Sequence, residues 1–119
     1  MDIIEFRDYC LAKPGVSESF PFGPDTLVFK VGGKMFALCN VDNFESINVK
    51  CDPERAIELR SEYEEHIKPG FHMNKKHWNT IRIPYFPNTT LLKELIDHSY
   101  TLVLEKLPKA IQVKLKSGI

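Results

Sequence analysis

The sequence has no apolar run that approaches the roughly 20 residues needed to cross a bilayer. Its N-terminus, MDIIEFRDYC, is acidic and lacks the basic start of a secretory signal peptide. Cysteine is scarce and odd in number, because only Cys10, Cys39 and Cys51 occur, and they are widely spaced. This pattern favours three reduced thiols over disulfides or a metal knuckle. We therefore expect a cytoplasmic protein that does not enter the membrane.

The motifs of common enzymes and nucleotide-binding proteins are also missing, since there is no P-loop, no G-x-G-x-x-G and no H-E-x-x-H. Cys39 and Cys51 fall on expected strands with no local sign of a base or an oxyanion hole. One group of carboxylates falls on an expected helix, where a solvated face accounts for it: Glu54, Glu58, Glu62, Glu64 and Glu65. We expect no enzyme activity, no catalytic residues and no cofactor.

Acidic residues are absent between Glu65 and Glu94, although the net charge of the whole chain is zero. Residues 1–65 carry 13 acidic and 7 basic residues, whereas residues 66–119 carry 3 and 9. Such asymmetry is typical of proteins that bind a polyanion. The alternative is that the two halves intermix in the fold and their charges average out.

The composition predicts one domain over residues 1–119. Hydrophobic residues make up 43% of the chain, which is enough apolar material for one core. A first helix begins at Asp2, where Glu5 completes a capping box, and Pro14-Gly15 ends it. Asp52-Pro53 starts a second helix, and Asn88 or Thr89 caps a long third one that ends before Pro108. The basic tail 109–119 is expected to fray.

The segment TLVFKVGGKMFALC predicts two strands joined by a tight turn at Gly32-Gly33. That turn predicts that Val31 faces Lys34, that Phe29 faces Phe36 and that Leu27 faces Leu38. Because directly opposed residues share a sheet face, one apolar face is expected. It contains Leu27, Phe29, Val31, Phe36 and Leu38.

Further strands are expected at ESINVKC, HIKPGFH and HWNTIRIP. The predicted order is α-β-β-β-α-β-β-α, an α+β fold of two layers. It consists of a five-stranded antiparallel sheet with the helices on one face. Ile47, Val49, Cys51, Ile81 and Ile83 are expected to point at the helices. The other sheet face is expected to be open and to carry Thr26, Val28, Lys30, Ser46, Asn48, Lys50, Trp78, Thr80 and Arg82.

The segment GFHMNKKHWNTIRI combines basic residues with the single tryptophan. His72 and His77 are a candidate metal pair, but a continuous strand would point them to opposite faces, and zinc sites use three or four ligands. We expect no metal there. Lysine and arginine neutralise phosphates, and an exposed aromatic side chain can stack on a base. The alternative is that Trp78 covers the edge of the core and that Lys75-Lys76 is a solvated turn.

Two stretches, PFGPDTLVFKVGGKMFAL and KPGFHMNKKHWNTI, resemble the MmcQ/YjbR family of small bacterial proteins. The resemblance covers nearly the whole chain. It implies a five-stranded antiparallel sheet with helices on one side, similar to secretion chaperones. It also implies DNA binding, because the fold is similar to the double-wing DNA-binding domain of a phage transcription factor. The family motif falls on His72, Met73, Asn74, Lys75, His77, Trp78 and Asn79, which would line the sheet and wing that meet DNA.

Taken together, these patterns predict a non-catalytic protein that binds double-stranded DNA through the open sheet face and a basic hairpin. The alternative is a protein–protein interaction module, in which Trp78, Val28 and Met35 would contact an apolar partner. The candidate nucleic-acid-binding residues are Lys30, Lys50, His72, Asn74, Lys75, Lys76, His77, Trp78 and Arg82.

Overall fold

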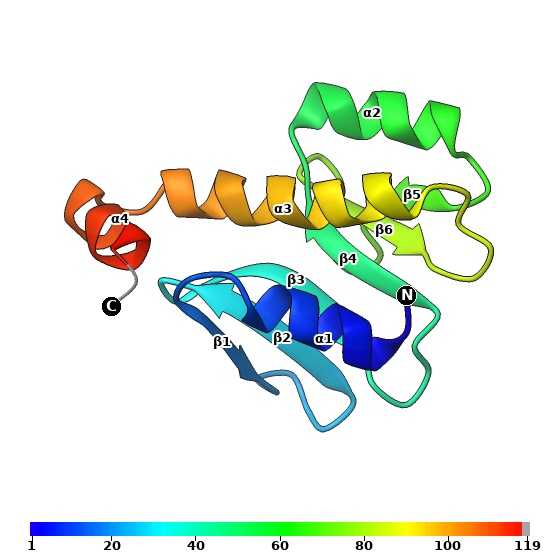
Figure 1. Cartoon of the computed structure of the whole chain (residues 1–119). Coiled ribbons are helices and arrows are strands. Elements are labelled where there is room, and N and C mark those ends of the chain that lie inside the picture. The colour runs from blue at the N-terminus through cyan, green and yellow to red at the C-terminus, as the bar shows by residue number, and fades with distance from the viewer. Residues whose placement is uncertain (118–119) are drawn as a thin grey trace.

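The computed structural model describes residues 1–117, which form four helices and one six-stranded antiparallel sheet. The strand order across the sheet is β1-β2-β3-β4-β6-β5. Helices α1 and α3 lie side by side over one face of this sheet (Figure 1). In chain order the elements are α1 (Ile3–Leu11), β1 (Val16–Ser19), β2 (Thr26–Val31), β3 (Lys34–Asn40), β4 (Ser46–Lys50), α2 (Pro53–Glu62), β5 (Ile67–Pro69), β6 (Trp78–Arg82), α3 (Thr89–Glu105) and α4 (Lys109–Lys116).

The predicted α+β class and antiparallel sheet are confirmed, but the five-stranded count and the element order are wrong. Strand β1 was missed because VSES is short and mostly polar. Its pattern of side chains does not differ from that of an irregular connecting segment. It pairs with β2, with Val16 opposite Val31. Helix α4 forms where fraying was expected, because the buried Gln112 side chain donates to the carbonyls of Glu105 and Leu107. Residues 118–119 of the expected frayed tail lie outside the described residues.

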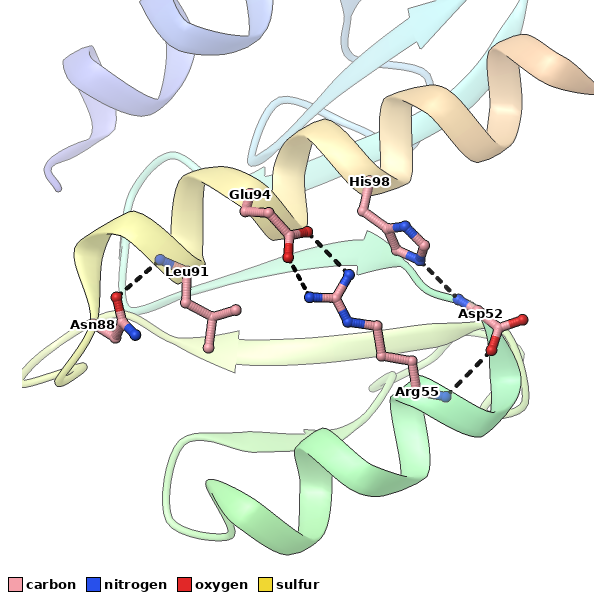
Figure 2. A network of polar contacts seen from close by, with 6 residues as sticks. All are labelled: Asp52, Arg55, Asn88, Leu91, Glu94 and His98. Carbon is pink, nitrogen blue, oxygen red and sulfur yellow. Dashed lines mark hydrogen bonds and ion pairs between the residues drawn. The ribbon is translucent and has the colours of Figure 1, made fainter.

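All three predicted helix caps are confirmed. The Asp2 carboxylate accepts a hydrogen bond from the Glu5 N–H at 2.8 Å. The Asp52 carboxylate accepts from the Arg55 N–H at 3.3 Å, and the Asn88 side chain accepts from the Leu91 N–H at 3.0 Å (Figure 2). Each bond satisfies one backbone donor that the first helical turn leaves unpaired.

Helix α2 is tied to α3 by a polar network that Figure 2 shows from close by. The Arg55 guanidinium donates two hydrogen bonds to the Glu94 carboxylate, a bidentate arrangement. His98 Nε2 accepts from the Asp52 backbone N–H at 3.2 Å. Burial and the nearby Arg55 charge lower the pKa of His98, which favours the neutral imidazole that accepts this bond. The network holds the start of α2 against the long helix.

The β2–β3 hairpin contains the expected tight turn, and Val31 lies opposite Lys34 as predicted, but the register beyond that pair differs from the prediction. Gly32 and Gly33 both have positive φ, 56° and 79°, as a two-residue turn of this kind requires. A bulge then shifts the pairing, so that Phe29 lies opposite Ala37 and Val28 opposite Leu38. The predicted pairs Phe29–Phe36 and Leu27–Leu38 are therefore wrong. Because of this shift, Leu38 lies on the face away from the helices.

The main core fills the space between the sheet and helices α1, α2 and α3. Phe6 of α1 packs edge-to-face on Phe29, and Phe36 packs in the same way on Tyr100 of α3. The inward strand positions predicted for Ile47, Val49, Cys51, Ile81 and Ile83 are confirmed, since all lie in this cluster. Cys10, Cys39 and Cys51 are buried and free. Within residues 1–117, no helix is both long enough and apolar enough to cross a membrane.

Candidate nucleic-acid interface

The sheet face turned away from the helices, here called the open face, carries basic but no acidic side chains in the described strands. The pairing register assigns Lys30, Lys50, Lys68 and Arg82 to it. Glu18, the only acidic residue on a strand, lies on the opposite face, where Arg7 of α1 donates to it at 2.8 Å. Within the described strands, the open face therefore carries only basic charges, and the one strand carboxylate lies on the other face.

Trp78 lies on the open face as predicted, but it is not exposed to solvent. Only 4% of its surface is accessible, because it packs with Val28 and Leu38 in a second, smaller cluster that Met35 and Met73 cover. The shifted register of β3 explains this burial, since it moves Leu38 onto the same face. The expected exposed patch of Trp78 and Val28 is therefore wrong.

The β5–β6 loop presents Lys75 and Lys76 to solvent, and an arginine on α2 secures it from behind. Arg60 Nε donates to the buried Asn79 side chain at 2.7 Å, and its guanidinium also donates to the carbonyls of Lys75 and Trp78. The Asn74 side chain accepts from the Lys76 N–H at 2.9 Å, which closes a local turn. These bonds fix the backbone conformation at Lys75 and Lys76.

Gly70 begins this loop, and it allows the loop to lie close against Trp78. A Cβ at this position would lie 2.6 Å from the Trp78 Cβ, and the Gly70 N–H donates to the Trp78 carbonyl at 2.8 Å. A side chain here would push the loop away from the sheet.

A cavity of about 320 Å³ lies at the end of β4 and is lined in part by Lys50, His77 and Lys106. Partial burial, followed by the positive charges of Lys106 and Lys34, lowers the pKa of Lys50. The Lys50 ammonium also lies 5.7 Å from the Trp78 ring centroid, within cation–π range. Lys50, Lys106 and Lys34 thus place three positive charges near this end of β4, beside the carboxylate of Asp52, which also lines the cavity.

A groove of about 510 Å³ crosses the open face itself. Its floor consists of strand residues from β2, β3 and β4, and its walls come from the β1–β2 and β5–β6 loops. Phe22 and Phe71 are 63% and 67% exposed on these walls. The complete lining is Phe22, Thr26, Leu38, Cys39, Asn40, Ser46, Asn48, Phe71, His72 and Met73.

His72 and His77 are not brought together, since His72 lines the groove and His77 lines the smaller cavity. No group of three or more His, Cys, Asp or Glu side chains within residues 1–117 could hold a metal ion.

Among the candidate residues, Lys30, Lys50 and Arg82 share the open face, and His72, Asn74, Lys75 and Lys76 lie on one loop beside it. Sequence analysis missed Lys68, Arg60, Phe22 and Phe71. The two phenylalanines lie in turn-rich stretches, PFGP and KPGF, where an aromatic residue has no alternating pattern to bury it. A large aromatic residue in a turn-rich stretch was thus the sequence feature that could have indicated an exposed contact residue.

Comparison with known proteins gives consistent matches over most of the chain. The YjbR family model matches residues 11–102. YbdF of Escherichia coli O157:H7 is 39% identical over 109 residues, covering 91% of this chain and 88% of YbdF. YjbR of Escherichia coli strain K12 is 32% identical over 110 residues, covering 92% of each chain. Both relatives are described as uncharacterised proteins.

Two solved structures share the fold. The crystal structure of DR2400 from Deinococcus radiodurans, described as a DUF419 domain, has a TM-score of 0.90 and 39% identity, covering 96% of this chain and 87% of DR2400. A crystal structure from Pseudomonas syringae has a TM-score of 0.71 and 28% identity, covering 87% of this chain and 99% of that protein.

Proposed function

The chain belongs to the YjbR family, and on that premise we propose that it is a non-catalytic DNA-binding protein. It contacts double-stranded DNA through the open face and the β5–β6 loop, and phosphate contacts supply most of the affinity. The observation that carries this proposal is the absence of acidic side chains from the open face of the described strands, which holds Lys30, Lys50, Lys68 and Arg82.

The charge arrangement supports a polyanion because each lysine or arginine that meets a phosphate releases condensed counterions. Lys75 and Lys76 extend the basic surface from the sheet onto the loop. The Arg60 hydrogen bond to the Lys75 carbonyl anchors that loop, which reduces the conformational entropy lost when the loop meets a DNA backbone. Phosphate contacts of this type orient a protein on DNA and carry no base sequence directly.

The test is a fluorescence-anisotropy titration of a labelled DNA duplex at several salt concentrations. The logarithm of the affinity should fall linearly with the logarithm of the salt concentration. Replacing Lys75 and Lys76 together with Ala should weaken binding to all duplex sequences alike and reduce the slope by about 1–2.

The matched control replaces Lys93 and Lys109 with Ala. Both are exposed, on α3 and α4, so the variant loses the same charge outside the open face. Equal losses in the two variants would mean that net charge alone acts. An absence of binding tighter than about 100 μM at low salt would reject DNA as the partner.

The second candidate is a protein-interaction module, and exposed aromatic residues beside an edge strand favour it. Phe20 and Phe22 are 48% and 63% exposed in the connection between β1 and β2, and β1 lies at the edge of the sheet. Edge strands can pair with an added strand from another chain. A protein partner held by apolar contacts would bind with weak salt dependence and a negative heat-capacity change.

A further inference from the structure

We propose that the open-face groove binds an unstacked nucleobase, so that single-stranded DNA is the preferred ligand over a duplex of the same sequence. This inference rests on the proposed DNA binding and adds a contact that paired, stacked bases cannot make. Four features of the groove carry it: its aromatic walls, its amide floor, its fixed loop and the sign of the neighbouring charge.

The walls supply two aromatic faces. Phe22 and Phe71 come from loops on different sides of the groove and remain 63% and 67% exposed. Large exposed apolar side chains that line a concave site are typical of ligand contact rather than of a folding core. Bases stack on aromatic side chains regardless of sequence, because every base has a π-face. Sheet surfaces with exposed aromatics bind single strands in this way.

The floor supplies polar groups that suit the edge of a base. The Asn48 side-chain oxygen accepts from the Thr80 hydroxyl, and the Asn40 oxygen accepts from the N–H groups of Asp42 and Asn43 at 2.9 Å. The amide N–H groups of Asn40 and Asn48 have no partner among the described residues. Both amides line the groove, where they can donate to the carbonyl and ring-nitrogen acceptors of a base.

The wall that carries Phe71 is fixed rather than loose. The Phe71 N–H donates to the Thr80 hydroxyl oxygen at 2.9 Å, and the centroids of the Phe71 and His72 rings are 4.1 Å apart. His72 has a positive φ of 59°, an uncommon conformation for a residue with a side chain. Such conformations persist where the surrounding structure holds them, and they concentrate at ligand sites.

The charges around the groove differ between its two ends, and this predicts the orientation of the strand. Arg82 and Lys68 lie on β6 and β5, beside the Phe71 wall, where they can meet backbone phosphates. On the other side, Asp25 precedes the groove residue Thr26 and Asp42 follows the groove residue Asn40 by two positions, and the interaction with Asp42 raises the pKa of Asp25. The base therefore enters the groove while its phosphates remain on the β5–β6 side. An apolar peptide would gain nothing from Lys68 or Arg82.

The experiment compares three labelled ligands of equal length: a single strand, its duplex, and a single strand of abasic sites that keeps the phosphates. The single strand should bind more tightly than both others by about 5- to 150-fold, the effect expected for one stacked base. Phe71→Ala and Phe22→Ala should lower single-strand affinity towards the abasic level and leave duplex affinity unchanged. Tyr85→Ala, which removes a 94% exposed aromatic outside the groove, is the matched control and should change nothing.

The outcomes separate the two proposals. Equal affinity for all three ligands, with Phe71→Ala equal to Tyr85→Ala, overturns the groove inference and leaves DNA binding intact. No binding to any ligand at low salt overturns the proposed function itself. Chemical-shift mapping with oligothymidylate provides an independent measurement. The resonances of Asn48, Phe71 and His72 should move, and groove resonances that stay in place while only Lys75 and Lys76 move would overturn the inference.

Discussion

Replacing Trp78 with Phe should destabilise the protein and leave the DNA affinity of the folded variant unchanged. Trp78 is 4% exposed and packs on Val28 and Leu38, with Met35 and Met73 over it. Its role is therefore to support the open face from within. A direct contact with a base would require an accessible ring.

The size of the effect follows from the atoms removed. Trp→Phe deletes three heavy atoms from a buried site, which at about 0.8 kcal/mol per methylene-sized group costs about 2 kcal/mol. Complete removal of the side chain in Trp78→Ala should cost about 3–5 kcal/mol, because a large cavity remains. Those losses are large compared with a typical unfolding free energy of about 5–15 kcal/mol.

Urea unfolding followed by far-UV circular dichroism measures the change in both variants. With a slope of about 1.5–2 kcal/mol per molar urea, Trp78→Phe should lower the midpoint by about 1 M. In the wild type, fluorescence gives a second probe of the same site, because Trp78 is the only tryptophan. The two probes should give the same midpoint if the small cluster unfolds together with the main core.

An unchanged urea midpoint together with a lost DNA affinity in Trp78→Phe would contradict this prediction. That combination would mean that Trp78 contacts the nucleic acid and that its packing on Val28 and Leu38 contributes little. A variant whose folded fraction is unchanged at the assay temperature is required for the comparison, so Trp78→Phe is the informative substitution and Trp78→Ala measures only stability.

Two further predictions concern the turn and the thiols. Gly32→Ala should destabilise more than Gly33→Ala, because both have positive φ but only at Gly32 would a Cβ meet Leu107, at 2.5 Å; each should cost about 1 kcal/mol or more in urea unfolding. Equal losses would remove the role given to Leu107. Unfolding free energy should fall above about pH 9, because burial raises the pKa of the Cys10 thiol, that of Cys39 to about 12 and that of Cys51 to about 11. The native protein then keeps protons that the unfolded chain releases, so the stabilisation is complete below the ordinary value of 9.0 and is lost as pH rises, by about 1.4 kcal/mol per thiol and pH unit. Cys51→Ala should remove about a third of that slope, and a flat profile between pH 9 and 11 would contradict it.

Local features of the sequence were sufficient for the helix starts, the tight turn and most inward strand positions. Asp2, Asp52 and Asn88 cap helices because a cap depends only on side chains and backbone within one turn. Gly32-Gly33 forms the hairpin turn because two consecutive positive φ values need no support from elsewhere. Lys30, Lys50 and Arg82 reach one face because side chains alternate along a strand.

Which residues those side chains contact depends on the tertiary structure. A single bulge in β3 places Leu38 on the open face, where it buries Trp78. The alternation of side chains along the strand had predicted an exposed Trp78. Phe71 and Phe22 form opposite walls of one groove, although 49 positions separate them in the chain. Arg60 on helix α2 donates a hydrogen bond to the Lys75 carbonyl and so anchors the β5–β6 loop. Contacts of this kind depend on register and on elements distant in sequence, and local patterns carry no information about either.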